Sequence, residues 1–165
     1  MIVFDASTLI LLAKVNLLDL FLDTYPAEAV IPQAVETECM ASPTRPDTTF
    51  IRERIQERRV RVDSVQGAAA VNRLIDDFRL GHGEAEAVVM ALERQARLVA
   101  TDDRNAIRAC KRLGLKFTTA IGVLIRMREK GVIPIDAALR YLEGLAMYGR
   151  YHRVILDDAR RRLGE

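Results

Sequence analysis

The sequence predicts an α/β fold in which a parallel sheet is covered by helices on both faces. Short apolar runs alternate with longer amphipathic segments along the whole chain. This alternation is typical of parallel strands joined by helical crossovers. Half of the 165 residues are apolar, and no repeat, low-complexity tract or linker divides the chain. We therefore expect a single domain over residues 1–165, with a helical extension from about residue 134.

The first part of the chain is predicted to contain three strands. The expected order is strand 1–4, helices 8–15 and 17–23, strand 29–31, a helix through Glu38, loop 41–49, helix 50–59 and edge strand 60–62. Asn16 is a typical N-cap for the helix that follows it. Pro32 ends the second strand and suits the first turn of the next helix. Two prolines indicate a mobile loop at 41–49.

The second part of the chain is predicted to be mainly helical. The expected order is helices 68–78 and 84–95, strand 97–101, helix 105–113, strand 116–118, and helices 120–130, 136–148 and 153–163. The tripeptide Gly81-His82-Gly83 interrupts the chain before the second of these helices. Gly114 is expected to close the helix that precedes the last strand.

Composition excludes several classes of protein. The net charge is +2, with 21 Arg and four Lys among the 25 basic residues, so overall charge alone does not indicate a nucleic-acid partner. Cys39 and Cys110 lack metal-ligand spacing and are expected to be buried, reduced thiols. Asp5 interrupts the first apolar run, which argues against a signal peptide. No stretch reaches about 18 apolar residues, so we expect a cytoplasmic protein without a membrane span.

Four acidic residues stand in unusually apolar surroundings. Asp5 and Asp102 directly follow predicted strands, whereas Glu38 and Glu84 lie on apolar-rich helical segments. The carboxyl ends of parallel strands share one edge of a sheet, where ligands bind, so we expect these side chains to meet there. Clustered carboxylates are costly unless a cation compensates them. Oxygen ligands without His or Cys favour Mg²⁺ or Mn²⁺.

Each acid also has a purely structural interpretation. Asp5 can cap a helix, Glu38 can be solvent-exposed, and acids such as Glu84 favour a helix N-terminus. In two places the choice of metal ligand between neighbouring acids stays open. Glu84 is preferred to Glu86 because it shares a helical stripe with Val88, Ala91 and Leu92. Asp102 is preferred to Asp103, which can cap the next helix, because Asp102 lies nearer the strand.

Four sequence segments, in order, resemble those of PIN-domain proteins. They are Asp5 to Lys14, Ile31 to Glu38, Gly83 to Ala87, and Thr101 to Arg104. Residues 122–124 and 130–133 are similar to the short prokaryotic branch related to VapC toxins. The resemblance covers about residues 1–134 and implies a three-layer α/β/α sandwich with Mg²⁺- or Mn²⁺-dependent ribonuclease activity.

By position, the resemblance implies catalytic roles for Asp5, Glu38, Glu84 and Asp102, of which Asp5, Glu84 and Asp102 bind the metal. Ser7 or Thr8 matches a hydroxyl beside the first acid, and Asp103 has a supporting role. An insertion-like segment at 42–65 and the longer C-terminal part depart from toxin-like members, which weakens the toxin assignment more than the chemistry.

The expected reaction is hydrolysis of RNA that leaves a 5′-phosphate and a 3′-hydroxyl, with Arg58, Arg59 and Arg104 binding the RNA. The resemblance also implies a homodimer and a possible antitoxin partner. Apolar segments 9–22 and 139–147 can form either a dimer interface or the core. The main rival is a non-catalytic module that binds RNA or a nucleotide; a phospho-acceptor domain fits less well, because Asp5 has no adjacent acid.

Overall fold

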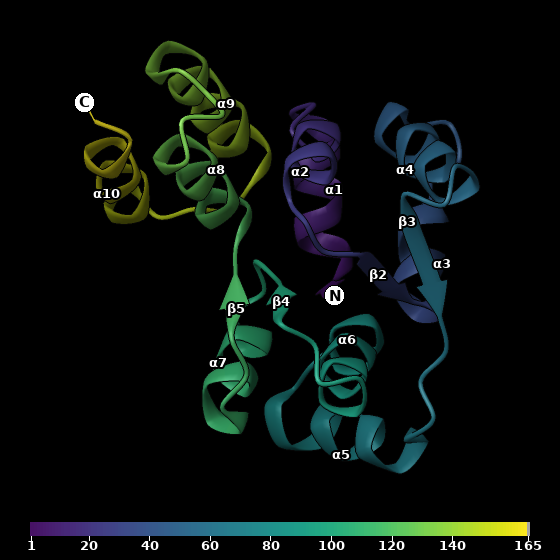
Figure 1. The fold of residues 1–165 in the computed structure, drawn as a ribbon. Helices are drawn as coiled ribbons and strands as arrows, with labels where there is room; N and C mark the ends of the chain where they lie inside the picture. The colour runs from purple at the N-terminus through teal and green to yellow at the C-terminus, as the bar shows by residue number, and fades with distance from the viewer. Residues whose placement is uncertain (165) are drawn as a thin grey trace.

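The computed structural model describes residues 1–164 and contains a five-stranded, all-parallel sheet (Figure 1). The strands are β1 (Ile2–Phe4), β2 (Ala29–Pro32), β3 (Val60–Asp63), β4 (Leu98–Ala100) and β5 (Phe117–Thr118). Their order is β3-β2-β1-β4-β5, so β1 is central. The strand β3 lies at an edge, as predicted. In register, Val3 of β1 pairs with Val30 on one side and Val99 on the other.

Helices cover both faces of this sheet. They are α1 (Ala6–Lys14), α2 (Leu18–Thr24), α3 (Gln33–Met40), α4 (Pro46–Gln56), α5 (Ala68–Phe78), α6 (His82–Glu93), α7 (Arg104–Leu113), α8 (Ala120–Glu129), α9 (Ile135–Tyr148) and α10 (Arg153–Leu163). Figure 1 shows α5, α6 and α7 on one side of the strands, with α1, α2, α8 and α9 on the other. The predicted α/β/α sandwich is confirmed.

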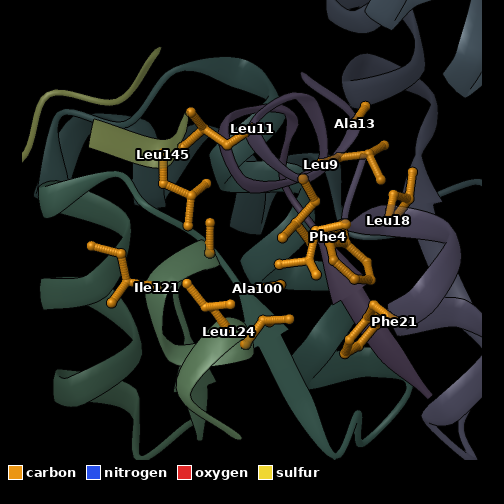
Figure 2. Close-up of a cluster of buried hydrophobic side chains, with 14 of the residues drawn as sticks. Phe4, Leu9, Leu11, Ala13, Leu18, Phe21, Ala100, Ile121, Leu124 and Leu145 are labelled. Atoms are coloured by element: carbon orange, nitrogen blue, oxygen red, sulfur yellow. The ribbon is translucent and has the colours of Figure 1, made fainter. Parts of the chain in front are cut away.

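Two apolar clusters fill the space between the layers. Successive strand residues point to opposite faces of a sheet. In β1, Ile2 and Phe4 therefore join the cluster under α1, α2 and α8, whereas Val3 joins the cluster under α5, α6 and α7. Figure 2 shows the first cluster around Phe4 and Leu9. Both clusters anchor β1, and so they fix the position of the residue that follows it.

Much of the apolar surface of α1 and of the start of α2 belongs to the core. Leu9, Leu12 and Leu17 have no exposed surface. The large apolar side chains that reach solvent include four near the junction of α9 and α10: Met147, Tyr148, Val154 and Ile155. Cys39 and Cys110 are buried free thiols, as expected. No helix within residues 1–164 has the length and apolar character needed to cross a membrane.

Several predicted element boundaries were wrong. Asn16 ends α1 instead of capping α2: its φ is +58°, its N–H donates to Ala13 O, and the Leu17 N–H donates to Leu12 O. This is a Schellman motif, in which Asn tolerates the left-handed conformation. Pro32 is the N-cap of α3. Pro46 occupies the first turn of α4, which therefore begins four residues earlier than predicted, within the expected loop.

Replacing Phe4 with Ala should destabilise the protein by about 3–5 kcal/mol, because the change leaves a cavity between β1 and α2. The Phe4 ring is fully buried and lies edge-on to the Phe21 ring, with centroids 5.7 Å apart. Urea unfolding measures the loss. As a control, Met147→Ala, at a side chain that is 77% exposed, should change stability by less than about 0.5 kcal/mol. Equal effects of the two changes would contradict the packing described here.

Candidate functional site

Asp5 is buried at the carboxyl end of the central strand. Only 1% of the residue is exposed, and its N–H donates to Ala100 O of β4 at 3.0 Å. Its carboxylate also caps α1, because Oδ1 accepts the Thr8 N–H at 3.0 Å. The capping role considered from the sequence is therefore real. The cap uses only Oδ1 of the Asp5 carboxylate. Capping alone also does not explain why Asp5 is buried, because an N-cap residue can be exposed.

Hydroxyl groups of three residues hold the Asp5 and Asp102 carboxylates, and that of Ser7 contacts both residues. Ser7 Oγ donates to Asp5 Oδ1 at 2.8 Å and accepts the Asp102 N–H at 3.1 Å. Thr8 Oγ1 donates to Asp102 Oδ2 at 2.6 Å. Thr101 Oγ1 donates to Asp5 Oδ2. The structure thus brings the two strand-end acids together, with both Ser7 and Thr8 between them. Sequence reasoning missed Thr101, although its place at the end of an apolar strand was a usable signal.

Asp102 accepts two further hydrogen bonds. Its Oδ2 accepts the Ala120 N–H at the start of α8 at 2.9 Å, and its Oδ1 accepts the Tyr151 hydroxyl at 2.6 Å. Tyr151 lies between α9 and α10, beyond the segments that carry the family resemblance. No local sequence pattern marks it, because the contact joins residues 49 positions apart.

Glu84 lies beside Asp102 on this edge, and Glu38 lies beside Glu84. Glu84, in the first turn of α6, lines an open pocket of about 370 Å³ together with Ser7, Asp102 and Asp103. Burial raises the pKa of Glu84, and the charges of Asp103 and Glu38 raise it further. Glu38 is solvent-exposed on α3, and its Oε1 accepts the Gly83 N–H at 3.2 Å.

Glu86 and Asp103, the alternatives to Glu84 and Asp102 as metal ligands, each accept a hydrogen bond from the first turn of a helix. Glu86 Oε2 accepts the Ala34 N–H in the first turn of α3 at 3.0 Å. Asp103 is the N-cap of α7, and its Oδ1 accepts the Ala106 N–H at 2.8 Å. Asp103 is nevertheless the charge with the largest effect on Glu84. The preference for Glu84 and Asp102 thus stays a prediction.

The helical-stripe argument for Glu84 was wrong in one respect. Leu92, which was placed on the same buried stripe, is 42% exposed. Val88 and Ala91 of the same stripe are fully buried, whereas Glu84 in the first turn of α6 is only half-buried.

Of the predicted RNA-binding arginines, only Arg104 lies at this edge. Arg104 follows Asp103 directly, and its Nη2 is 2.7 Å from His152 Nε2. Arg58 and Arg59 immediately precede β3, so they lie at the amino ends of the strands, the opposite edge of the sheet. Arg59 forms salt bridges there with Asp19 and Asp23. The positive groups that do line the pocket are Lys14 and Arg150.

The side chains at this edge fit a hard divalent cation in charge and in donor type. Burial raises the pKa of Asp5 from 3.8 to about 7; hydrogen bonds from Thr101, Thr8 and Ser7 lower it, and the charge of Asp102 raises it. Within residues 1–164, Asp5, Glu84 and Asp102 form no salt bridge. No ion pair among the described residues therefore neutralises these three carboxyl groups, and the available donors are oxygens. However, no three acidic, His or Cys side chains in this part of the chain form a ready-made metal cluster.

A family model described as a PIN domain matches residues 1–165. No curated protein and no solved structure matches the chain significantly.

The free energy of unfolding of the metal-free protein should fall as the pH rises from about 4 to about 7, because of Asp5. In this range the unfolded chain releases the Asp5 proton, whereas the folded protein retains it up to a pKa of about 7. The loss should be on the order of 4 kcal/mol and should be absent in Asp5→Asn, which cannot ionise. Urea unfolding of both proteins in EDTA from pH 4 to pH 8 measures this difference. Parallel pH profiles would show that burial does not hold the proton on Asp5.

Proposed function

Because the family match spans the whole chain, the protein belongs to the PIN-domain family, and we propose that it is a Mg²⁺- or Mn²⁺-dependent ribonuclease. PIN domains are generally nucleases. The observation that carries the proposal is the hydroxyl-linked pair formed by the buried Asp5 and the half-buried Asp102. Helix capping explains one oxygen of Asp5, but it does not explain a second carboxylate beside it without a cationic partner.

Asp5, Glu84 and Asp102 would hold the metal, and Glu38 would complete the site or orient a water molecule. When bound, a divalent ion lowers the pKa of a coordinated water and neutralises charge on phosphate oxygens. Ser7 and Thr8 keep the two Asp carboxylates in fixed orientations through their hydroxyl groups. Such fixed orientations reduce the reorganisation needed when the ion arrives.

The surroundings of the pocket favour a polyanionic substrate. Lys14 and Arg150 line it, and Arg104 lies at the start of the neighbouring helix α7. These positive groups would contact backbone phosphates on either side of the scissile bond and offset repulsion by the carboxylates. The choice of RNA over DNA as the substrate rests on the family resemblance. The expected products of cleavage carry a 5′-phosphate and a 3′-hydroxyl.

The resemblance alone also supports a homodimer, an antitoxin partner and a cytoplasmic location. The exposed apolar side chains at the junction of α9 and α10 are where a protein contact would bury apolar surface.

The wild-type protein should cleave labelled RNA in the presence of Mn²⁺ and lose this activity in EDTA. Asp5→Asn should lower the rate by more than about 100-fold, beyond the loss typical of residues that only support a metal ligand. Gel analysis of RNA and of DNA of the same sequence measures rate and substrate class. Cleavage that survives EDTA or the substitution would contradict the metal site. RNA binding without cleavage by the wild-type protein would favour the non-catalytic alternative.

The two neighbouring glutamates should respond differently to the same change. Glu84→Gln should abolish metal-dependent cleavage with little loss of stability, because burial already opposes the charged form of Glu84. Glu86→Gln should retain cleavage but destabilise the protein by about 1 kcal/mol, because a weaker acceptor then caps α3. Rates together with urea unfolding of both variants separate the roles. The reverse pattern would assign the metal to Glu86.

A further inference from the structure

We propose that Tyr151 is a positioning residue that orients Asp102 for metal binding, so that the linker between α9 and α10 (residues 149–152) is part of the active site. This inference rests on the proposed function. It assigns a role to a part of the chain that contains none of the four motif segments described from the sequence, and it is carried by contacts that converge on one carboxylate.

The Asp102 carboxylate is held from three directions. Oδ2 accepts from Thr8 Oγ1 at 2.6 Å and from the Ala120 N–H at 2.9 Å, which uses both lone pairs of that oxygen. Among the bonds within residues 1–164, Oδ1 accepts only that from the Tyr151 hydroxyl, at 2.6 Å. One lone pair of Oδ1 is therefore left to face a cation. Tyr151 is the donor that prevents this oxygen from turning away.

The backbone near Tyr151 is adapted to the position of its ring. Gly149 has φ −92° and ψ 159°, an extended conformation open to any residue, so backbone freedom does not require glycine here. A Cβ atom at this position would instead overlap Cε2 of the Tyr151 ring and lie 2.9 Å from Leu145 O. The absence of a side chain at Gly149 thus makes room for the ring where its hydroxyl reaches Asp102.

A second contact holds the same linker against the same strand end. His152 Nε2 lies 2.7 Å from Arg104 Nη2, two residues beyond Asp102. Adjacent linker residues therefore contact both Asp102 and Arg104. The acceptor of the Tyr151 hydroxyl is the side-chain carboxylate of Asp102. Hydrogen bonds to carboxylates are stronger than those between neutral groups. Loss of the Tyr151 bond should affect the orientation of Asp102 more than the docking of α10.

The test measures Mn²⁺ binding by isothermal titration calorimetry on the full chain without RNA. Tyr151→Phe removes only the hydroxyl and should weaken Mn²⁺ binding by about 10-fold, the usual effect of losing a hydrogen bond to a metal ligand. Gly149→Ala keeps the hydroxyl but displaces the ring, and it should weaken binding to a similar extent. Tyr141→Phe is the control, since Tyr141 packs against the core and its hydroxyl makes no hydrogen bond in the described structure.

Thermal unfolding in EDTA separates positioning from folding. If Tyr151→Phe lowers the melting temperature but leaves Mn²⁺ affinity at the wild-type value, Tyr151 is structural and the inference is overturned. Equal weakening by Tyr141→Phe would overturn it as well. If the wild-type protein binds no Mn²⁺, or Asp5→Asn binds it equally well, the proposed metal site itself fails. Wild-type binding that depends on Asp5 but not on Tyr151 leaves the function intact and refutes this inference alone.

Discussion

The burial of the Asp5 carboxylate at the end of the central strand is the constraint around which this edge of the molecule is built. Apolar clusters on both sheet faces fix β1, and so Asp5 cannot move toward solvent. Three hydrogen bonds, from Thr8, Ser7 and Thr101, offset part of the cost of burial. The remaining cost is visible in the raised pKa of Asp5, which is caused mainly by burial and to a smaller extent by the charge of Asp102.

This constraint connects the fold to the chemistry. Because β4 lies beside β1, the strand-end residue Asp102 stands next to Asp5, and the first turn of α1 supplies the hydroxyls between them. Glu84 enters from α6, whose N-terminus also receives Glu38. The site therefore draws on strands and helices that are far apart in sequence, and the sheet order brings them together. A cation at this edge would relieve repulsion that the protein itself leaves uncompensated.

The sequence predicted those features that depend on local periodicity or on sheet topology. Short continuous apolar runs marked β1 and β4, and the shared edge of parallel strands placed Asp5 beside Asp102. Features that depend on side chains meeting across elements were missed. The contact of Tyr151 with Asp102 spans 49 positions, and that of Glu86 with Ala34 spans 52. Arg59 was predicted to bind RNA, but its partners are Asp19 and Asp23 at the opposite edge. No periodic pattern encodes such pairings.

The measurement that tests this account most directly is the anomalous diffraction of a crystal soaked in Mn²⁺. The account predicts an ion at the carboxyl edge of the sheet, coordinated by Asp5 and Asp102 with Glu84, and with Tyr151 still donating to Asp102. An ion coordinated by Asp103 and Glu84 without Asp5 would contradict it. So would a crystal in which Mn²⁺ binds elsewhere and leaves the Asp5 carboxylate buried without a cation.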